Sequence, residues 1–388
     1  MTETQSGNLS FDNHKLDRLL EQAGLDAVLI TSKHNIQYLL GGYRYFFYSF
    51  MDAHGLSRYL PFIVYVRGNL DKAAYVGSPM ERFEKDLGKF WMSKTDFTSM
   101  TTVKYAAAAA AHLQKVGLAS GRIGIEPGYL PVDAYEALRS ALPEAKLENA
   151  TFPLELLRTV KTPTELAILK AASEKVIDSM AAVFATHGPG STKNELIAAL
   201  RKEEQDRGLL FEYCLCNIGT DFNRAPSNQV WKDGEVLCLD SGGNYQGYIG
   251  DLARMAYAGK PDSELEDLLG FIEEVQQAAR KPIKPGALGG EIYVVPDQLV
   301  AKSPLKANLE FVAHGMGIVS HEGPWLTDRC SVPYEAYHAG QPLEAGMVLS
   351  IETTLHHPKR GFIKLEDTVV VTDTSWESYG DGARGWNG

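Results

Sequence analysis

The chain contains 388 residues, 44% of them hydrophobic and 22% charged, a composition typical of a globular protein long enough for two domains. Its net charge of −11 and its lack of a Lys/Arg cluster argue against nucleic acid as a partner. No signal-peptide pattern and no membrane-spanning apolar run is visible, so we expect a cytoplasmic protein that does not bind a membrane.

Helix-like and strand-like patterns alternate along residues 1–155. Apolar and β-branched runs predict strands over 26–31, 61–66, 72–76 and 122–125. Helical spacing predicts helices around 16–20 and over 101–116 and 132–141. This alternation predicts a small α/β domain at the N-terminus.

A second domain is predicted over residues 156–388. Thr162-Pro163 ends one element, and Thr164 is suited to cap the next helix. Helices are expected over 165–186, 193–207, 264–280 and 292–301. Strands are expected over 235–241, 248–257, 309–313, 347–353 and 361–372. The whole chain is thus of α/β (α+β) class.

Four acidic residues of the second domain lie in or beside strand-like apolar runs: Asp240, Asp251, Glu352 and Glu366. Burying a carboxylate in such a run is costly unless a positive group offsets the lost hydration. Solvated hairpin ends explain any one of these acids, but they explain all four together poorly. A pair of divalent cations would supply the missing charge.

The first two acids flank the Gly-rich segment 242–247, which is typical of a hairpin turn. A turn centred between Tyr245 and Gln246 predicts that Asp240 lies opposite Asp251. The two carboxylates would then share one face, with Cβ atoms about 4.5–5.5 Å apart.

The other two acids flank a second turn-like segment, 357–361. A turn centred near Lys359 predicts that Glu352 lies opposite Glu366. Like charges so close raise one pKa unless a cation lies between them. An oxygen-rich site with one imidazole suits Mn, Fe, Co or Zn, and two ions about 3.5–4 Å apart activate a bridging water.

Five short motifs, in this order and spacing, resemble those of the creatinase/aminopeptidase P/methionine aminopeptidase family: 239–242, 250–254, 314–317, 350–352 and 365–368. The resemblance covers nearly the whole chain. It implies a pita-bread catalytic domain over 156–388, preceded by a creatinase-like domain over 1–155. It also implies a homodimer.

The resemblance further implies a centre of two divalent ions, of Mn, Co, Zn or Fe, with Asp240 on one ion, Asp251 and Glu366 bridging both, and His314 and Glu352 completing the other. Glu352 would also shuttle the proton of the bridging water, which is the nucleophile. His321 falls where the family places a histidine that contacts the substrate.

The chain departs from the family peptidases around this centre. Asn223 lies in the neighbourhood where a histidine usually precedes the first aspartate, and Glu310 replaces the histidine four residues before His314. Thr353 replaces the proline of an Ile-Glu-Pro motif, and Lys364 stands where proline-specific members often have arginine. The metal centre therefore resembles the family more closely than the peptide-binding residues do.

Candidate substrate contacts are Asn223, Glu310, Tyr45 and Trp325. Tyr45 belongs to an aromatic stretch, 43–50, whose rings suit either a bound cation or ordinary packing. In creatinase-like dimers, a loop of this domain reaches the partner's active site.

The resulting hypothesis is a dimetal hydrolase of a C–N bond, similar to Xaa-Pro dipeptidases and aminopeptidases. The alternatives are an enzyme resembling creatinase or ectoine hydrolase that acts on a small metabolite, a lyase resembling dimethylsulfoniopropionate lyase, and a non-catalytic binding protein of the same fold.

Overall fold

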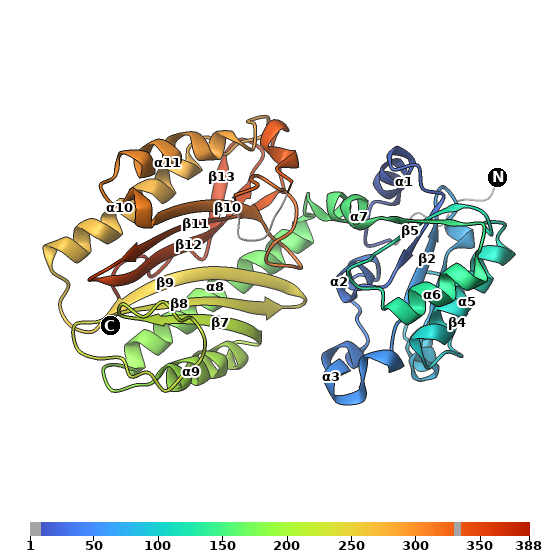
Figure 1. Ribbon diagram of the computed structural model, residues 1–388, viewed down its shortest axis with the longest axis horizontal. Coiled ribbons are helices and arrows are strands. Elements are labelled where there is room, and N and C mark those ends of the chain that lie inside the picture. The colour runs from blue at the N-terminus through green and yellow to red at the C-terminus, as the bar shows by residue number, and fades with distance from the viewer. Residues whose placement is uncertain (1–8, 330–334) are drawn as a thin grey trace. The chain divides into compact units, whose positions relative to one another are not determined.

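The computed structural model describes residues 9–329 and 335–388. They belong to two compact units, Met1–Leu157 and Arg158–Gly388, whose elements are drawn in Figure 1. Within the described ranges, no helix is both long enough and apolar enough to cross a membrane.

The N-terminal unit is a six-stranded mixed sheet with helices packed against it. The strand order β4-β3-β2-β1-β5-β6 uses β1 (Ala27–Ile30), β2 (Phe62–Val66), β3 (Ala74–Val76), β4 (Lys94–Asp96), β5 (Arg122–Ile125) and β6 (Lys146–Asn149). The helices are α1 (Asn13–Gln22), α2 (Lys33–Leu39), α3 (Met51–His54), α4 (Arg82–Asp86), α5 (Thr102–Lys115), α6 (Val132–Ala141) and α7 (Thr151–Arg158). The predicted α/β alternation is confirmed. The edge strands β4 and β6 were not predicted, because they are short and partly exposed.

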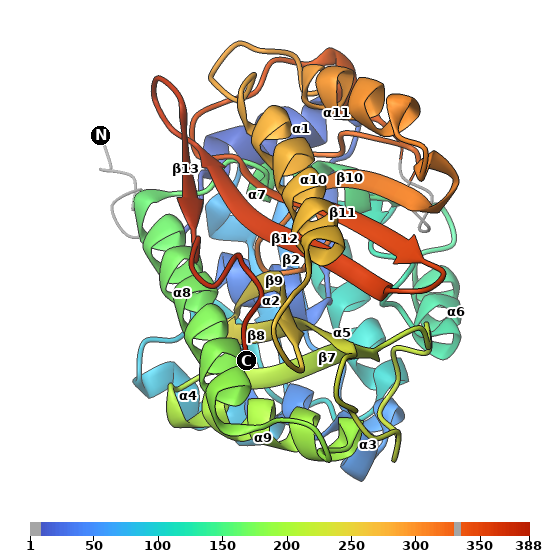
Figure 2. The same ribbon diagram turned by 90° about the vertical axis from the view of Figure 1, so that its left-hand side faces the viewer.

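The C-terminal unit is a seven-stranded antiparallel sheet of order β10-β11-β12-β9-β8-β7, with β13 paired to β12. Its strands are β7 (Leu210–Ile218), β8 (Val236–Tyr245), β9 (Tyr248–Tyr257), β10 (Leu309–Gly315), β11 (Val348–His357), β12 (Gly361–Val371) and β13 (Trp376–Tyr379). Its helices are α8 (Pro163–Thr186), α9 (Lys193–Asp206), α10 (Ser263–Arg280) and α11 (Glu291–Lys302). The strands lie between two helix pairs, α8 with α9 and α10 with α11 (Figures 1 and 2).

Helix α8 begins two residues earlier than expected. Thr162, not Thr164, is the N-cap: its hydroxyl accepts a hydrogen bond from the Glu165 backbone, and the Glu165 carboxylate accepts one from the Thr162 backbone. Pro163 takes the first helical position, where its missing N–H costs nothing. The helix then packs on β8 and β9.

The first hairpin turn lies one residue further along the chain than expected. Tyr245 pairs with Tyr248, so the turn residues are Gln246 and Gly247, and both have positive φ. Two-residue turns of this kind match the twist of the flanking strands. Strand β8 continues to Tyr245, so only the last two residues of the Gly-rich segment 242–247 form the turn.

The register of this hairpin therefore differs from the prediction by two residues. Asp240 lies opposite Ala253, and Asp251 lies opposite Gly242, so the expected direct pairing of the two aspartates is wrong. A shift of two residues nevertheless keeps every side chain on its predicted face. For the second hairpin the prediction is confirmed, since Glu352 pairs with Glu366.

Candidate metal centre

Three of the four acids lie in one row across the sheet. Asp240 on β8 and Glu366 on β12 both lie opposite Ala253 of β9. Glu366 lies in turn opposite Glu352 of β11. Directly opposed residues point to the same face, and the small side chain of Ala253 leaves room between the carboxylates.

Asp251, His314 and Lys364 occupy the same face, because side chains two residues apart on a strand point the same way. Asp251 lies two residues from Ala253 on β9, and Lys364 lies two residues from Glu366 on β12. His314 lies two residues from Val312 of β10, the residue opposite Glu352. The five predicted metal ligands are therefore brought together. Ligand atoms lie within 4.8 Å of one another in each of three groups: Asp251, His314 and His321; His314, Glu352 and Glu366; and Asp240, Asp251 and Glu366.

A buried lysine reaches the centre of this cluster. The Nζ atom of Lys364 lies 2.7 Å from Asp240 Oδ2, 2.5 Å from Glu352 Oε2 and 2.8 Å from Glu366 Oε2. Burial alone lowers the pKa of Lys364, but the attraction of Asp240 and the two glutamates outweighs burial and raises that pKa well above its usual range. The side chain is therefore held as an ammonium ion.

Arg224 adds a second positive charge. Its guanidinium donates to Asp240 Oδ2, the oxygen that Lys364 also contacts, and it lies over the Phe362 ring, 5.2 Å from the centroid. The sequence showed Lys364 only as a departure from a family pattern, and it gave no signal that Arg224 pairs with Asp240.

Asp251 lacks comparable compensation. Burial, with the nearby charges of Glu366 and Asp240, raises the pKa of Asp251 well above its usual range. The Tyr213 hydroxyl donates to Asp251 Oδ1 at 2.7 Å. Gly242 makes this contact possible, because a Cβ at that position would lie 2.3 Å from the Tyr213 ring.

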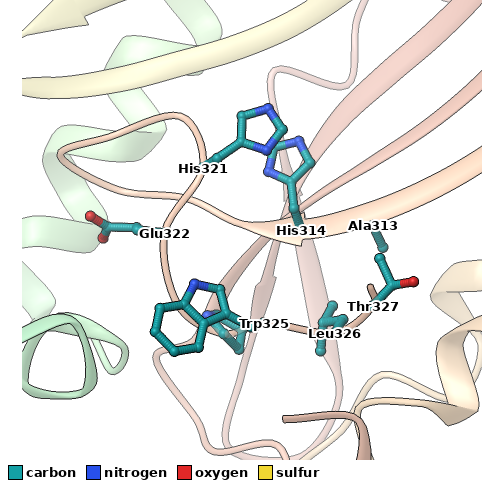
Figure 3. A pocket seen from close by; sticks show the side chains of 8 residues that line it. Ala313, His314, His321, Glu322, Trp325, Leu326 and Thr327 are labelled. Atoms are coloured by element: carbon teal, nitrogen blue, oxygen red, sulfur yellow. The ribbon is translucent and has the colours of Figure 1, made fainter. Parts of the chain in front are cut away.

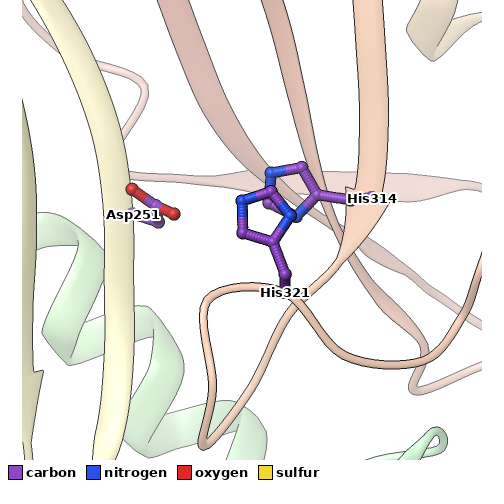
Figure 4. A group of neighbouring side chains, drawn as sticks. All are labelled: Asp251, His314 and His321. Carbon is purple, nitrogen blue, oxygen red and sulfur yellow. The ribbon is translucent and has the colours of Figure 1, made fainter. Parts of the chain in front are cut away.

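Two histidines face Asp251 across the site (Figure 4). The rings of His314 and His321 stack with centroids 3.8 Å apart. Burial, together with the charge of His314, lowers the pKa of His321 to about 4. Burial also opposes charge on His314, but nearby Glu366 and Glu352 raise the pKa of His314 to about 9.

These residues fit at least one divalent ion. His314 Nε2 is buried and has no hydrogen-bond partner among the described residues, and it lies 3.7 Å from Glu366 Oε1 and 3.9 Å from Glu352 Oε1. Carboxylates with one imidazole suit Mn, Fe, Co or Zn. Asp251, His314, Glu352 and Glu366 together would therefore hold such an ion.

The loop that carries His321 is fixed by a buried ion pair. Glu322 lies 3.1 Å from both Arg158 and Lys161, and these contacts lower the pKa of Glu322 despite its burial. Trp325 lines a space of about 10 Å³ behind His314 and His321 (Figure 3). That space holds no more than about one water, so it has no room for a substrate next to Trp325.

A larger cavity, of about 170 Å³, opens beside the acids. It is lined by Arg224, Glu310, Val312, His321, Glu352, Thr354, His356, Phe362 and Lys364. Among the proposed substrate contacts, Glu310 lines this cavity, whereas Asn223 and Trp325 are not among its described lining residues. The Asn223 side chain instead accepts a hydrogen bond from the Ala225 backbone.

The remaining candidate, Tyr45, lies in the N-terminal unit. It is 4% exposed and packs in that unit's core, with its ring 5.7 Å from that of Tyr59. Phe46 next to it is 51% exposed. Within its own unit, Tyr45 is thus a packing residue.

Comparisons with known proteins agree with this fold. Residues 167–373 match metallopeptidase family M24, and residues 14–160 match the creatinase/prolidase N-terminal domain. An uncharacterized peptidase of Bacillus subtilis is 25% identical over 369 residues, covering 92% of this chain and 94% of that protein. A creatinase from a Bacillus species is 25% identical over 396 residues, covering 94% and 89%. The solved Xaa-Pro dipeptidase of Bacillus anthracis superposes with a TM-score of 0.81 at 20% identity, covering 97% of this chain and 98% of that one.

The fold and the carboxylate cluster define a two-domain protein of the pita-bread class. The chain belongs to metallopeptidase family M24, a family of metal-dependent hydrolases, and it carries the creatinase/prolidase N-terminal domain.

Proposed function

We propose that this protein hydrolyses a C–N bond in a substrate of about dipeptide size. One observation carries the proposal: four acids and His314 converge on one face of the sheet, beside a cavity of about 170 Å³. The named dipeptidases among the relatives support it, including an Xaa-Pro dipeptidase of Pyrococcus horikoshii that is 22% identical over 375 residues.

The ion would be held by Asp251, His314, Glu352 and Glu366. When bound, it supplies Lewis acidity toward a substrate carbonyl and toward water. The acids keep it in a water-poor site, where electrostatic effects are stronger than in solvent.

Glu352 is the acid best placed to move a proton. Its side chain is 19% exposed and lines the cavity, whereas those of Asp240 and Glu366 are 3% exposed. Burial, only partly offset by Lys364, raises the pKa of Glu352. A carboxylate with a raised pKa accepts a proton from water and returns it to a leaving amine.

His321 also lines the cavity, and its lowered pKa keeps the ring uncharged near neutral pH. A neutral imidazole can hydrogen-bond the substrate without adding charge to the site. Arg224, 31% exposed, offers its guanidinium to a substrate carboxylate such as the C-terminus of a dipeptide.

A small amide or guanidino metabolite is the second candidate. The cavity wall carries Arg224, Glu310 and Lys364, and these charged groups suit a compact polar molecule as well as a peptide. One of the relatives is a creatinase.

The test is a substrate panel assayed after Mn²⁺ or Co²⁺ loading. It contains an Xaa-Pro dipeptide, the same dipeptide with its carboxylate amidated, an Xaa-Ala dipeptide and creatine. We expect turnover of a free dipeptide and a higher KM both for its amide and for the Arg224→Met variant. Turnover of creatine alone would favour the second candidate, and no turnover of any C–N bond would contradict both.

A further inference from the structure

We propose that the Lys364 ammonium takes the place of a second metal ion, so that each chain binds one divalent ion. The inference rests on the metal-dependent function proposed above, and it departs from the dinuclear centre that the family resemblance implies. It has three supports: the contacts of Lys364, the division of the carboxylate oxygens, and the charge balance.

The contacts place Lys364 as a structural cation. Its Nζ atom has three carboxylate oxygens within 2.8 Å, one from each of three strands. An ammonium group has three N–H donors, so each is matched by one acceptor. The side chain is 5% exposed, and leaving three acids without it would cost desolvation energy on each.

The two glutamates divide their oxygens between two sides of the site. Lys364 contacts Glu352 Oε2 and Glu366 Oε2. His314 Nε2 faces the other oxygen of each, Glu352 Oε1 and Glu366 Oε1. One side of the cluster thus already has its cation, and the other presents two oxygens and a ring nitrogen.

Asp240 belongs to the lysine side. Its Oδ2 accepts from both Lys364 and Arg224, so fixed side-chain cations already neutralise it. Asp251, by contrast, accepts a hydrogen bond from the Tyr213 hydroxyl, which is neutral and adds no positive charge. Asp251 is therefore the aspartate that the ion needs.

The balance of charges also indicates one divalent ion per chain. With His314 neutral, as a metal ligand must be, four carboxylates carry four negative charges, and Lys364 with Arg224 offsets two of them. One divalent ion neutralises the remainder, whereas two would leave the buried site with an excess of positive charge, which is costly in a low-dielectric interior.

The experiment measures bound Mn²⁺ per chain by equilibrium dialysis and mass spectrometry, on the full chain. We expect one ion for the wild type and one for Asp240→Asn, but none for Asp251→Asn. Two ions in the wild type would overturn this inference and leave the proposed function standing. No ion in the wild type would overturn both. Equal loss in the two aspartate variants would overturn the assignment of Asp240 to the lysine side.

Lys364→Met provides the converse test, because it removes the ammonium and keeps the length of the side chain. We expect its Mn²⁺ content to rise from one ion toward two, and its electron paramagnetic resonance spectrum to change from that of an isolated Mn²⁺ to that of a coupled pair. Lys359→Met, in the exposed β11–β12 turn, is the matched control and should remain at one. An unchanged stoichiometry in folded Lys364→Met would show that the lysine does not exclude the second ion.

Discussion

Glu366 and Asp367 are neighbours on β12, but they point to opposite faces of the sheet and meet different charges. Asp367 lies 3.1 Å from Arg254, 2.9 Å from Arg280 and 2.5 Å from Arg384. Burial raises the pKa of Asp367, but these three guanidinium groups outweigh burial and lower it. Glu366 instead shares Lys364 with two other acids.

This difference separates buried acids whose charge the protein balances from buried acids whose charge it does not. On the Asp367 face, the protein supplies more than enough fixed positive charge. On the Glu366 face it supplies too little, and Asp251 bears the deficit in its raised pKa. A buried acid whose charge the protein does not balance is stable only with a proton or a bound cation.

The largest effect is expected on the Glu366 face. Asp251→Asn should reduce turnover by more than about a hundredfold. Loss of a residue that only hydrogen-bonds a metal ligand usually costs about 10–100-fold, and loss of a ligand should cost more. Because the substitution removes an uncompensated negative charge, the metal-free variant should unfold at a higher temperature than metal-free wild type. Thermal unfolding with a chelator present checks this, and a lower temperature would contradict the charge deficit.

On the Asp367 face, the effect should be on stability. Asp367→Asn removes the anion that the buried Arg254 and Arg280 share with the half-buried Arg384, which should cost roughly 3–5 kcal/mol of unfolding free energy. Metal content should not change. Asp381→Asn, whose side chain is 44% exposed, is the control and should cost less than about 1 kcal/mol. Urea titrations measure both unfolding free energies. Similar losses for Asp367→Asn and Asp381→Asn would contradict the structural role given to Asp367.

A third buried acid, Glu81 in the N-terminal unit, sharpens the comparison because tyrosine hydroxyls surround it in place of cations. Tyr75 and Tyr59 donate to it at 2.6 and 3.0 Å, yet burial raises the pKa of Glu81 to about 7.

Because the folded form of this acid binds its proton more tightly than the unfolded form does, stability should fall as pH rises from about 4.5 to about 7, by about 3 kcal/mol. Glu81→Gln has no such proton to lose, so its unfolding free energy relative to that of the wild type should increase over this pH interval. Urea titrations of both proteins at pH 5 and pH 8 measure this increase. An equal change in unfolding free energy with pH in the two proteins would contradict it.

The smallest effect concerns the hydroxyl on Asp251. Tyr213→Phe keeps the ring against Gly242 but removes the donor 2.7 Å from Asp251 Oδ1. Affinity for Mn²⁺ should weaken by about 10–100-fold, as measured by competition with a fluorescent chelator. Unchanged affinity would mean that this hydroxyl does not orient the carboxylate.

Much of this arrangement could be predicted from the sequence, because it depends on local patterns. Alternation and turn residues were enough to put Glu352 opposite Glu366. They placed Asp240 on the correct face but in the wrong register. The glycines of β8 suggest a turn, but they are strand residues at positions where neighbouring groups leave no space for a Cβ atom. Gly242, for example, admits the Tyr213 ring.

The compensating charges could not be predicted in this way. Arg224 comes from the connection before β8, and Lys364 from β12, 124 positions after Asp240. Only the folded sheet shows that both reach the same oxygen. The sequence predicts Asn223 of the same segment as a substrate contact, but it is the neighbouring Arg224 that lines the cavity.

The central claim is that the unbalanced acids around Asp251 and His314 hold a divalent ion. The most direct measurement is the visible absorption of the chelator-treated protein during titration with Co²⁺, for the wild type and for His314→Ala. We expect ligand-field bands that saturate in the wild type and are lost or weakened in the variant. Bands of equal intensity in both proteins, or none in the wild type, would contradict it.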